Sequence, residues 1–102
     1  MITRIWRARA TLDGAQKYRL HFEHNVIPGL RALKGFRQAY LLTRERDGSV
    51  DIEVHTLWDS LDAIRTFAKP DLEAAVVEPQ ARAALGDFDT RVTHFATLSY
   101  PA

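Results

Sequence analysis

The chain has 102 residues, the size of one domain with a single hydrophobic core. Apolar residues make up 46% and charged residues 26% of the chain. The 14 Lys and Arg side chains nearly balance the 13 Asp and Glu, so the net charge does not indicate a nucleic acid or an anionic membrane as a partner. The absence of cysteine excludes a disulfide framework, an iron–sulfur cluster, a thiolate zinc site and a cysteine nucleophile.

The N-terminal segment, residues 2–10, mixes β-branched and aromatic residues with arginines, which predicts a strand. The arginines interrupt the apolar stretch that a signal peptide needs, and no apolar run in the chain reaches the ~20 residues of a membrane span. We therefore expect a soluble, cytoplasmic protein whose single domain covers residues 1–102.

Residues 15–33 have the spacing of an amphipathic helix. Its apolar stripe consists of Ala15, Tyr18, Phe22, Val26, Leu30 and Leu33. Thr11 or Asp13 is expected to cap the start of this helix. Pro28 lies inside the pattern and is expected to bend the last turns, and Gly35 is expected to end the helix.

Two strand-like segments follow, residues 36–44 and 49–58, joined by a tight turn at Asp47-Gly48. In the second segment apolar and polar residues alternate, Val50, Ile52 and Val54 with Asp51, Glu53 and His55. This alternation predicts a sheet with one buried face and one polar face.

The rest of the chain predicts a second helix, further short helices and a last strand. Asp59 and Ser60 are expected to open the second helix, and Pro70 to end it. The apolar side of this helix carries Leu61, Ile64, Phe67 and Ala68. Residues 71–85 predict one or two short helical pieces broken by Pro79, and residues 90–100 predict the last strand.

The element order is β-α-β-β-α-β, which predicts a ferredoxin-like α+β fold. We expect a four-stranded antiparallel sheet whose last strand pairs with the first and whose helices cover one face. The uncovered face is expected to be apolar, through Ile5, Ala39, Leu41, Leu57 and Phe95. An exposed apolar patch usually marks an interface, so we expect a homodimer through this sheet face.

Five segments resemble the antibiotic-biosynthesis-monooxygenase (ABM) family, a branch of the dimeric α+β barrel superfamily. They are IWRARA (5–10), VIPGLRALKGFRQAYLLTR (26–44), LWDSLDAIRTFA (57–68), AVVEP (75–79) and VTHF (92–95). The most specific piece is Trp-Asp-Ser-Leu-x-Ala-x-x-x-Phe after the third strand. The resemblance implies the ferredoxin-like fold and a dimeric barrel. It leaves the activity open among cofactor-free monooxygenases, haem-degrading enzymes and isomerases.

The haem-degrading branch needs an aromatic wedge and an axial histidine on the following helical piece. Phe67 stands about where the wedge would be, but the stretch from Pro70 to Pro79 contains no histidine. Haem without an axial ligand would be held poorly, so this activity is not favoured.

His94 and Trp6 are the candidate catalytic residues. His94 is in phase with Val92, Ala96 and Leu98, so it is expected to face the helices, with a lowered pKa because of burial. Trp6 lies midway along the first strand and is expected to be its neighbour. An imidazole beside an aromatic wall would suit a flat phenolic ligand. A buried, hydrogen-bonded core histidine is an equally valid interpretation.

Seven further residues are candidates for substrate binding. An apolar box would be formed by Tyr18, Phe22, Tyr40, Trp58 and Phe67, and a polar rim by His21 and Asn25. Core packing is the alternative role for the aromatic residues. His21 and His24 are three apart, and His55 or His94 would be needed as a third metal ligand. No recognised metal spacing completes this set, so no metal site is expected.

The sequence therefore predicts a cofactor-independent monooxygenase of the ABM type, acting on a small aromatic, phenolic or quinol-like substrate. No flavin, nicotinamide or metal motif is present, so no cofactor is expected. A non-catalytic dimer that binds a small molecule, as a sensor or carrier, is the alternative, and a structural dimer with a filled core is a third hypothesis. A helix–sheet cavity of ~300 Å³ or more with His94 exposed in it would favour the first two.

Overall fold

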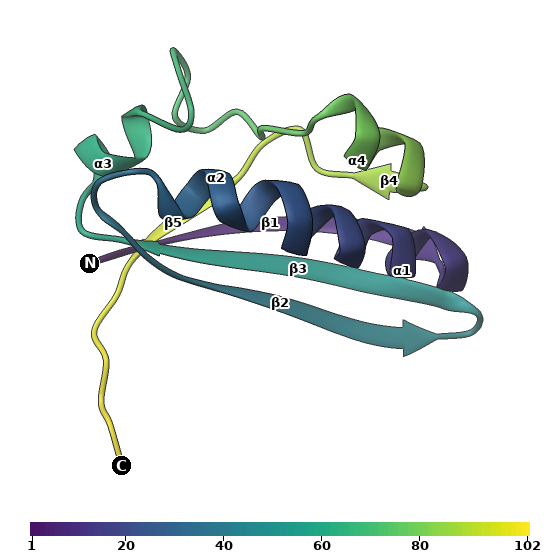
Figure 1. Ribbon diagram of the computed structural model, residues 1–102. Coiled ribbons are helices and arrows are strands. Elements are labelled where there is room, and N and C mark those ends of the chain that lie inside the picture. The colour runs from purple at the N-terminus through teal and green to yellow at the C-terminus, as the bar shows by residue number, and fades with distance from the viewer.

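One antiparallel sheet carries all the helices on a single face in the computed structural model, which describes residues 1–102 (Figure 1). The elements are β1 (Ile2–Thr11), α1 (Leu12–His21), the π-helical segment η1 (Phe22–Val26), α2 (Ile27–Arg31), β2 (Phe36–Arg46), β3 (Ser49–Trp58), α3 (Leu61–Arg65), α4 (Pro79–Ala84), β4 (Asp87–Phe88) and β5 (Thr93–Ala96). None of these helices is long and apolar enough to cross a membrane.

The strand order is β2-β3-β1, and both β4 and β5 pair with the free edge of β1. All pairs are antiparallel, so the ferredoxin-like arrangement and the pairing of the last strand with the first are confirmed. The last strand is shorter than expected, because only Thr93–Ala96 is paired in place of residues 90–100. The two-residue β4 was not predicted, since so short a strand has no readable periodicity.

The alternation of β3 is confirmed residue by residue. Val50, Ile52 and Val54 are buried against the helices, and the odd-numbered residues face the other side of the sheet. The turn at Asp47-Gly48 has positive φ at both residues, 53° and 80°, as a two-residue hairpin turn requires. The hairpin therefore brings β2 alongside β3 in the expected antiparallel direction.

The first helix forms as one run over α1, η1 and α2, and its apolar stripe faces the sheet. Thr11 caps it, since its side-chain oxygen accepts a hydrogen bond from the Gly14 amide at 3.0 Å. Stripe residues recur every four positions from Tyr18 to Leu30, and an α-helix of 3.6 residues per turn would rotate each step by about 40°. The wider π turn at Phe22–Val26 offsets this drift, and Pro28 lies just beyond it at the start of α2.

A β-bulge at the start of β2 changes which of its residues face the helices. Phe36 pairs with Trp58 and Gln38 with Leu57, so Arg37 is the extra residue. One extra residue inverts the phase of the strand, because side chains alternate with period two. Ala39 and Leu41 therefore pack against the core, and the expectation that they lie on the uncovered face is wrong.

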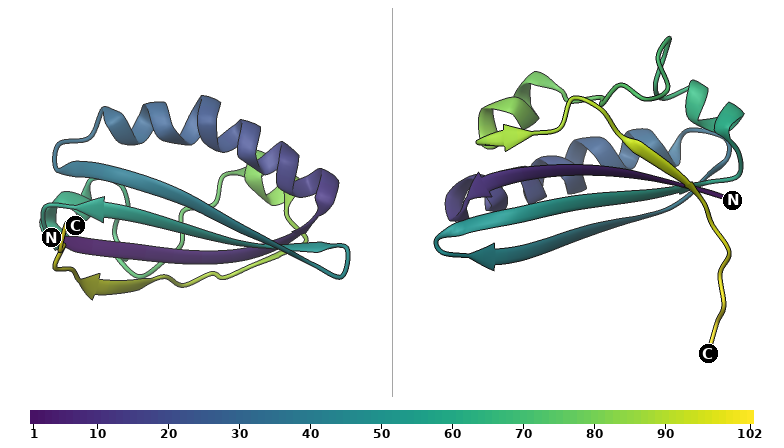
Figure 2. Two further views of the ribbon diagram at one scale, coloured as in Figure 1. Left: turned by 90° about the horizontal axis from the view of Figure 1, so that it is seen from below. Right: turned by 180° about the vertical axis from the view of Figure 1, so that it is seen from behind.

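The outer, helix-free face of the sheet still carries apolar side chains. The residues exposed or half-exposed there include Ile5, Tyr40, Leu42, Leu57 and Phe95. Tyr40 and Leu42 thus take the places expected for Ala39 and Leu41. The C-terminal tail leaves the body of the molecule on this same side (Figures 1 and 2), and it carries the highly exposed Leu98 and Tyr100.

The ends of the helices follow the local signals. Gly35 has a φ of 89°, and a Cβ at this position would lie 2.5 Å from the Cβ of Ala63, so only glycine fits the turn between α2 and β2. Ser60 caps α3 and accepts from the Ala63 amide at 3.2 Å. The close turn and the cap hold α3 against the end of the first helix.

Residues 71–78 do not form the helical piece expected there. Residues 71–74 form a turn, in which the Ala74 amide donates to the Asp71 carbonyl at 3.2 Å. The chain around Ala74 is held against residues 90–92, just before β5, by backbone bonds from Ala75 to Thr90 at 2.9 Å and from Val92 to Glu73 at 2.8 Å. Pro79 begins α4 and does not break a helix, because the first turn of a helix needs no amide hydrogen there. The segment before α4 forms one wall of the cavity described next.

Candidate active site

A small cavity lies between the first helix, the inner face of the sheet and the segment before α4. Its volume is about 70 Å³, and most of its lining is apolar. The aromatic side chains around it are Trp6, Tyr18, Phe22 and Phe67. A cavity that holds one benzene ring measures roughly 150 Å³, so there is room here for dioxygen or a few waters but not for a phenol. The cavity is therefore smaller than the ~300 Å³ that would favour an enzyme or a binding protein over a structural dimer with a filled core, and His94 does not line it.

His21 ends α1 beside the π turn and is 3% exposed. Its Nδ1 accepts a hydrogen bond from the Asn25 amide nitrogen at 3.0 Å, so in the neutral ring the proton lies on Nε2. Nε2 is buried and has no hydrogen-bond partner, because the nearest carboxylate oxygen, Oε1 of Glu78, lies 3.8 Å away. His21 lines the cavity, so this donor is available to a bound molecule.

Arg4 also lines the cavity and is 4% exposed. Its guanidinium donates to the carbonyl oxygens of Leu72 at 2.5 Å and Ala74 at 2.8 Å, and to Nε2 of His94 at 3.0 Å. It stacks over the Phe67 ring at 5.6 Å. Burial lowers the pKa of Arg4 to about 10, so the side chain remains charged at neutral pH. None of its partners is a carboxylate.

His94 lies behind Arg4 and does not line the cavity. The register of β1 and β5 places it opposite Arg4, so the expectation that Trp6 is its neighbour is wrong. Because an arginine only donates, Nε2 of His94 must accept, which requires the neutral ring. Burial, followed by the charge of Arg4, lowers the pKa of His94, as expected. Its lone pair is engaged by Arg4, and the assignment of His94 as the base remains a prediction.

Trp6 lies in the cavity wall, where its ring packs 5.7 Å from that of Tyr18 and 6.5 Å from that of Phe88. The indole Nε1 donates to the carbonyl oxygen of Asp89 at 2.8 Å, so this side chain is anchored at its polar end. Burial, with a contribution from Glu78, raises the pKa of Tyr18, so its hydroxyl remains protonated. These two residues supply a rigid aromatic surface.

The structure brings together five of the nine predicted site residues at the cavity, Trp6, Tyr18, His21, Phe22 and Phe67. Asn25 stands behind His21 and also donates to Gln80 at 3.1 Å. Trp58 is fully buried in the core with Leu30 and Ile64. Tyr40 lies on the outer face, 48% exposed, because the bulge at Arg37 inverts its strand.

Three polar lining residues were missed, Arg4, Thr56 and Glu78. Arg4 could have been found, since it shares the phase of Trp6 and Ala8, the helix-facing side of the first strand. A charged residue in a buried phase is uncommon and indicates a special environment. Glu78 is the only carboxylate in the lining, and no sequence signal identified it because the segment before α4 was predicted to be helical.

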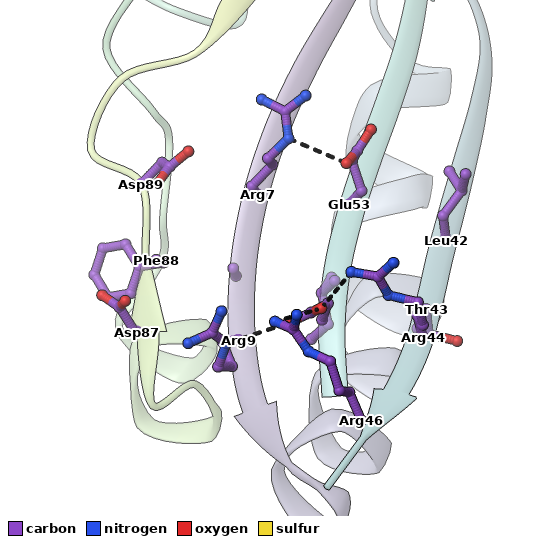
Figure 3. Close-up of a pocket in the computed structure, with 13 residues that line it drawn as sticks. Arg7, Arg9, Leu42, Thr43, Arg44, Arg46, Glu53, Asp87, Phe88 and Asp89 are labelled. Atoms are coloured by element: carbon purple, nitrogen blue, oxygen red, sulfur yellow. Dashed lines mark hydrogen bonds and ion pairs between the residues drawn. The ribbon is translucent and has the colours of Figure 1, made fainter. Parts of the chain in front are cut away.

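A larger hollow of about 610 Å³ lies on the outer face near the β2–β3 turn (Figure 3). Four arginines gather there, but Asp51 lies within 3.1 Å of Arg9, Arg44 and Arg46. Arg7 is paired with Glu53 at 3.1 Å. Each of these arginines is paired with a carboxylate and is more than half exposed to solvent, so a ligand there would compete with water and with Asp51 and Glu53. The buried helix–sheet cavity is therefore the better candidate.

The histidines do not form a metal centre. His24 is exposed on the first helix, and His55 lies on the outer face bound to Glu53 at 2.6 Å. No group of three or more His, Cys, Asp or Glu side chains is arranged to hold a metal ion. The absence of a metal and of any other cofactor remains a prediction.

The fold and the cavity define a ferredoxin-like α+β domain with a buried, aromatic-walled site. No family model matches the chain, and no curated protein matches its sequence. Among solved structures, it is similar to SnoaB, a cofactor-independent oxygenase from Streptomyces nogalater, with a TM-score of 0.62 and 21% identity over 97% of this chain and 94% of that one. It is also similar to a candidate antibiotic biosynthesis monooxygenase from Deinococcus radiodurans, with a TM-score of 0.58 and 19% identity over 100% and 97%. The expected likeness to the ABM family is thus confirmed at the level of the fold.

Proposed function

We propose that the protein is a cofactor-independent monooxygenase of the ABM type, acting on a small aromatic, phenolic or quinol-like substrate in the helix–sheet cavity. The observation that carries the proposal is the pair of unsatisfied polar groups in an apolar cavity: the free Nε2–H of His21 and the uncompensated charge of Arg4. A core that serves packing alone does not retain such groups, because each is costly to bury. The likeness of fold to SnoaB supports the same conclusion.

The chemistry needs no external reductant. Loss of a proton makes the phenolic substrate an electron-rich anion, which reacts with dioxygen to form a carbon–oxygen bond and a hydroperoxide. Loss of the one proton on the attacked ring carbon, with cleavage of the O–O bond, then releases water and leaves the second carbonyl group of a quinone. One oxygen atom enters the substrate and the other leaves as water, and the O–H and C–H bonds that the phenol loses supply the electrons.

The side chains of the cavity provide matching roles. Tyr18 and Trp6 hold the flat ring, and the Nε2–H of His21 donates to a substrate oxygen. Glu78 is at the rim, 54% exposed at its side chain, and is placed to pass the substrate proton to water. Nε2 of His94 accepts a hydrogen bond from Arg4, so His94 would act as the base only after this bond breaks.

Substrate entry requires the wall formed by residues 76–78 to move. Val76 is 48% exposed, so this wall is a single layer of side chains between cavity and solvent. The segment has no regular secondary structure, and the hydrogen bonds to its backbone come from Arg82, whose Nε donates to the Val77 carbonyl at 3.1 Å and whose amide donates to that of Glu78 at 3.0 Å. Such segments open at low free-energy cost compared with helices and strands.

Oxygen uptake with a panel of dihydroxy-aromatic compounds tests the proposal. Ala81 lines the cavity from α4, and Ala83 lies exposed on the same helix, so Ala81→Leu and Ala83→Leu add the same atoms inside and outside the site. We expect uptake by the wild type with a chelator present and no added flavin, retention in Ala83→Leu, and loss in Ala81→Leu. Binding of the compounds without any uptake would refute catalysis and favour the carrier or sensor.

We also propose a homodimer through the outer face of the sheet. The exposed apolar residues Tyr40, Leu42 and Phe95 lie on that face, and the exposed C-terminal tail leaves on the same side. A helix layer covers only the opposite face, so this patch stays in contact with water in one chain (Figure 1). A second copy of the chain, offering the same patch, would bury it.

A further inference from the structure

We propose that Arg4 forms an oxyanion-binding site in the cavity and that the substrate is bound there as an aromatic phenolate or enolate. This inference deepens the proposed monooxygenase function and rests on it. It assigns to Arg4 the direct contact with the charged oxygen of the substrate, and it restricts the substrate class to phenols and enols that ionise on binding.

The hydrogen bonds of Arg4 leave part of its guanidinium free. A guanidinium has five N–H groups. Three of them are used, by the carbonyl oxygens of Leu72 and Ala74 and by His94. All three acceptors are neutral, since His94 must be unprotonated at the nitrogen that accepts. The fixed contacts orient the guanidinium plane, and the remaining N–H groups are available to a molecule in the cavity that Arg4 lines.

The charge of Arg4 has no counter-ion in the protein. The ion pairs of the other arginines join exposed or partly exposed side chains, and Arg4 takes part in none of them. Glu78, the only carboxylate of the cavity lining, lies nearest to His21 and is at the solvent rim. A buried arginine without an anion bears the cost of desolvation without the compensating Coulombic attraction, so an anion that enters the cavity is strongly stabilised.

The surroundings select an aromatic anion over a simple inorganic one. Eleven of the fifteen lining residues are hydrophobic, and the Phe67 ring already stacks against the guanidinium at 5.6 Å. Hydrated inorganic anions would lose water here without enough donors to replace it. Arg4 and the Nε2–H of His21 line the cavity as donors for a phenolate oxygen, and Trp6 and Tyr18 line it as surfaces for the ring. Two donors and an apolar wall match that shape.

The experiment uses 4-nitrophenol, whose phenolate absorbs at longer wavelength than the phenol, and 4-nitroanisole, the methyl ether that cannot ionise. An opposite charge at close range lowers the pKa of an acid by roughly 1–3 units. We therefore expect the pKa of 4-nitrophenol bound to the wild-type protein to be lower than that of the free compound by this amount. We expect 4-nitroanisole to bind at least about tenfold more weakly at a pH where the bound phenol is ionised.

Three variants separate the effect of Arg4 from the general positive charge of the strand. In Arg4→Gln the pKa shift of the bound probe and the preference over 4-nitroanisole should disappear. Arg7→Gln removes a charge from the same strand but from the outer face, and it should leave both unchanged. Arg4→Lys retains the charge and should keep part of the shift. Circular dichroism checks that each variant is folded, and the comparison of the two probes on the wild type stands without any variant.

The outcomes distinguish this inference from the proposed function. Equal binding of both probes with an unshifted pKa would overturn the oxyanion site and leave the cavity and the oxygenase proposal standing. A shift that survives in Arg4→Gln would likewise overturn the assignment to Arg4. Failure of the wild type to bind either probe would overturn the cavity as a binding site, and with it both proposals.

Discussion

Replacement of His21 by phenylalanine is expected to stabilise the protein while it lowers activity. The buried Nε2–H has no partner, and leaving such a donor unsatisfied costs about 1–3 kcal/mol. The substitution also removes the hydrogen bond from Asn25, worth about 0.5–1.5 kcal/mol. Asn25 is exposed and still donates a hydrogen bond to Gln80, so its amide group is not left without a partner. The adjoining cavity of about 70 Å³ accommodates the slightly larger ring.

The difference between these effects is a gain in the free energy of unfolding of about 1 kcal/mol, which raises Tm by about 4–8 °C in a domain of this size. Thermal unfolding followed by circular dichroism measures the gain, and oxygen uptake measures the expected loss of activity. His24→Phe, an exposed change three residues away, is the control and should shift stability by no more than about 0.5 kcal/mol. Destabilisation of His21→Phe by about 1 kcal/mol or more, the worth of one typical hydrogen bond, would refute the reasoning and make His21 a structural residue.

Three further predictions concern pH, assembly and cofactors. Because burial and the charge of Arg4 lower the pKa of His94, the unfolded chain takes up the imidazole proton before the folded protein does as the pH falls. The contribution of neutral His94 to the free energy of unfolding is therefore present above about pH 6.5 and is lost below it. The urea midpoint should fall on acidification more in the wild type than in His94→Phe, and identical pH profiles for the two proteins would contradict this. In sedimentation experiments Phe95→Glu should convert the dimer to a monomer, and Leu12→Glu, a change at an exposed helix position, should not. A wild-type monomer near 11.6 kDa at micromolar concentration would disprove the dimer. The purified protein should show neither a shifted Soret band nor one zinc per chain in metal analysis, and either result would disprove the prediction of no haem or metal.

Much of the fold could be predicted because its signals are local. The alternation from Val50 to Val54, the positive-φ turn at Gly48 and the stop at Gly35 each depend on a few neighbouring residues and on their backbone preferences. The apolar stripe of the first helix likewise predicts that Tyr18 and Phe22 face the sheet, and there they form part of the cavity wall. Even the π turn has a local cause, the four-residue spacing of that stripe.

The candidate site was less predictable, because its polar groups meet across long stretches of chain. Arg4 comes from the first strand, and its partners Leu72 and His94 are 68 and 90 residues away. The partner that His94 receives depends on the register of β5 against β1, which no local pattern specifies. For this reason the sequence indicated a titratable group on the last strand but not that its lone pair is engaged by a buried arginine.

The sequence alone thus determined the element order, the buried face of β3 and the aromatic wall of the cavity, since periodicity and turn chemistry act over a few residues. Only the tertiary structure decided that the bulge at Arg37 turns Tyr40 outward, that residues 71–78 form no helix, and that the cavity measures only about 70 Å³. The physical reason is that one inserted residue inverts a strand's faces, and a segment's backbone takes whichever hydrogen-bond partners distant elements offer.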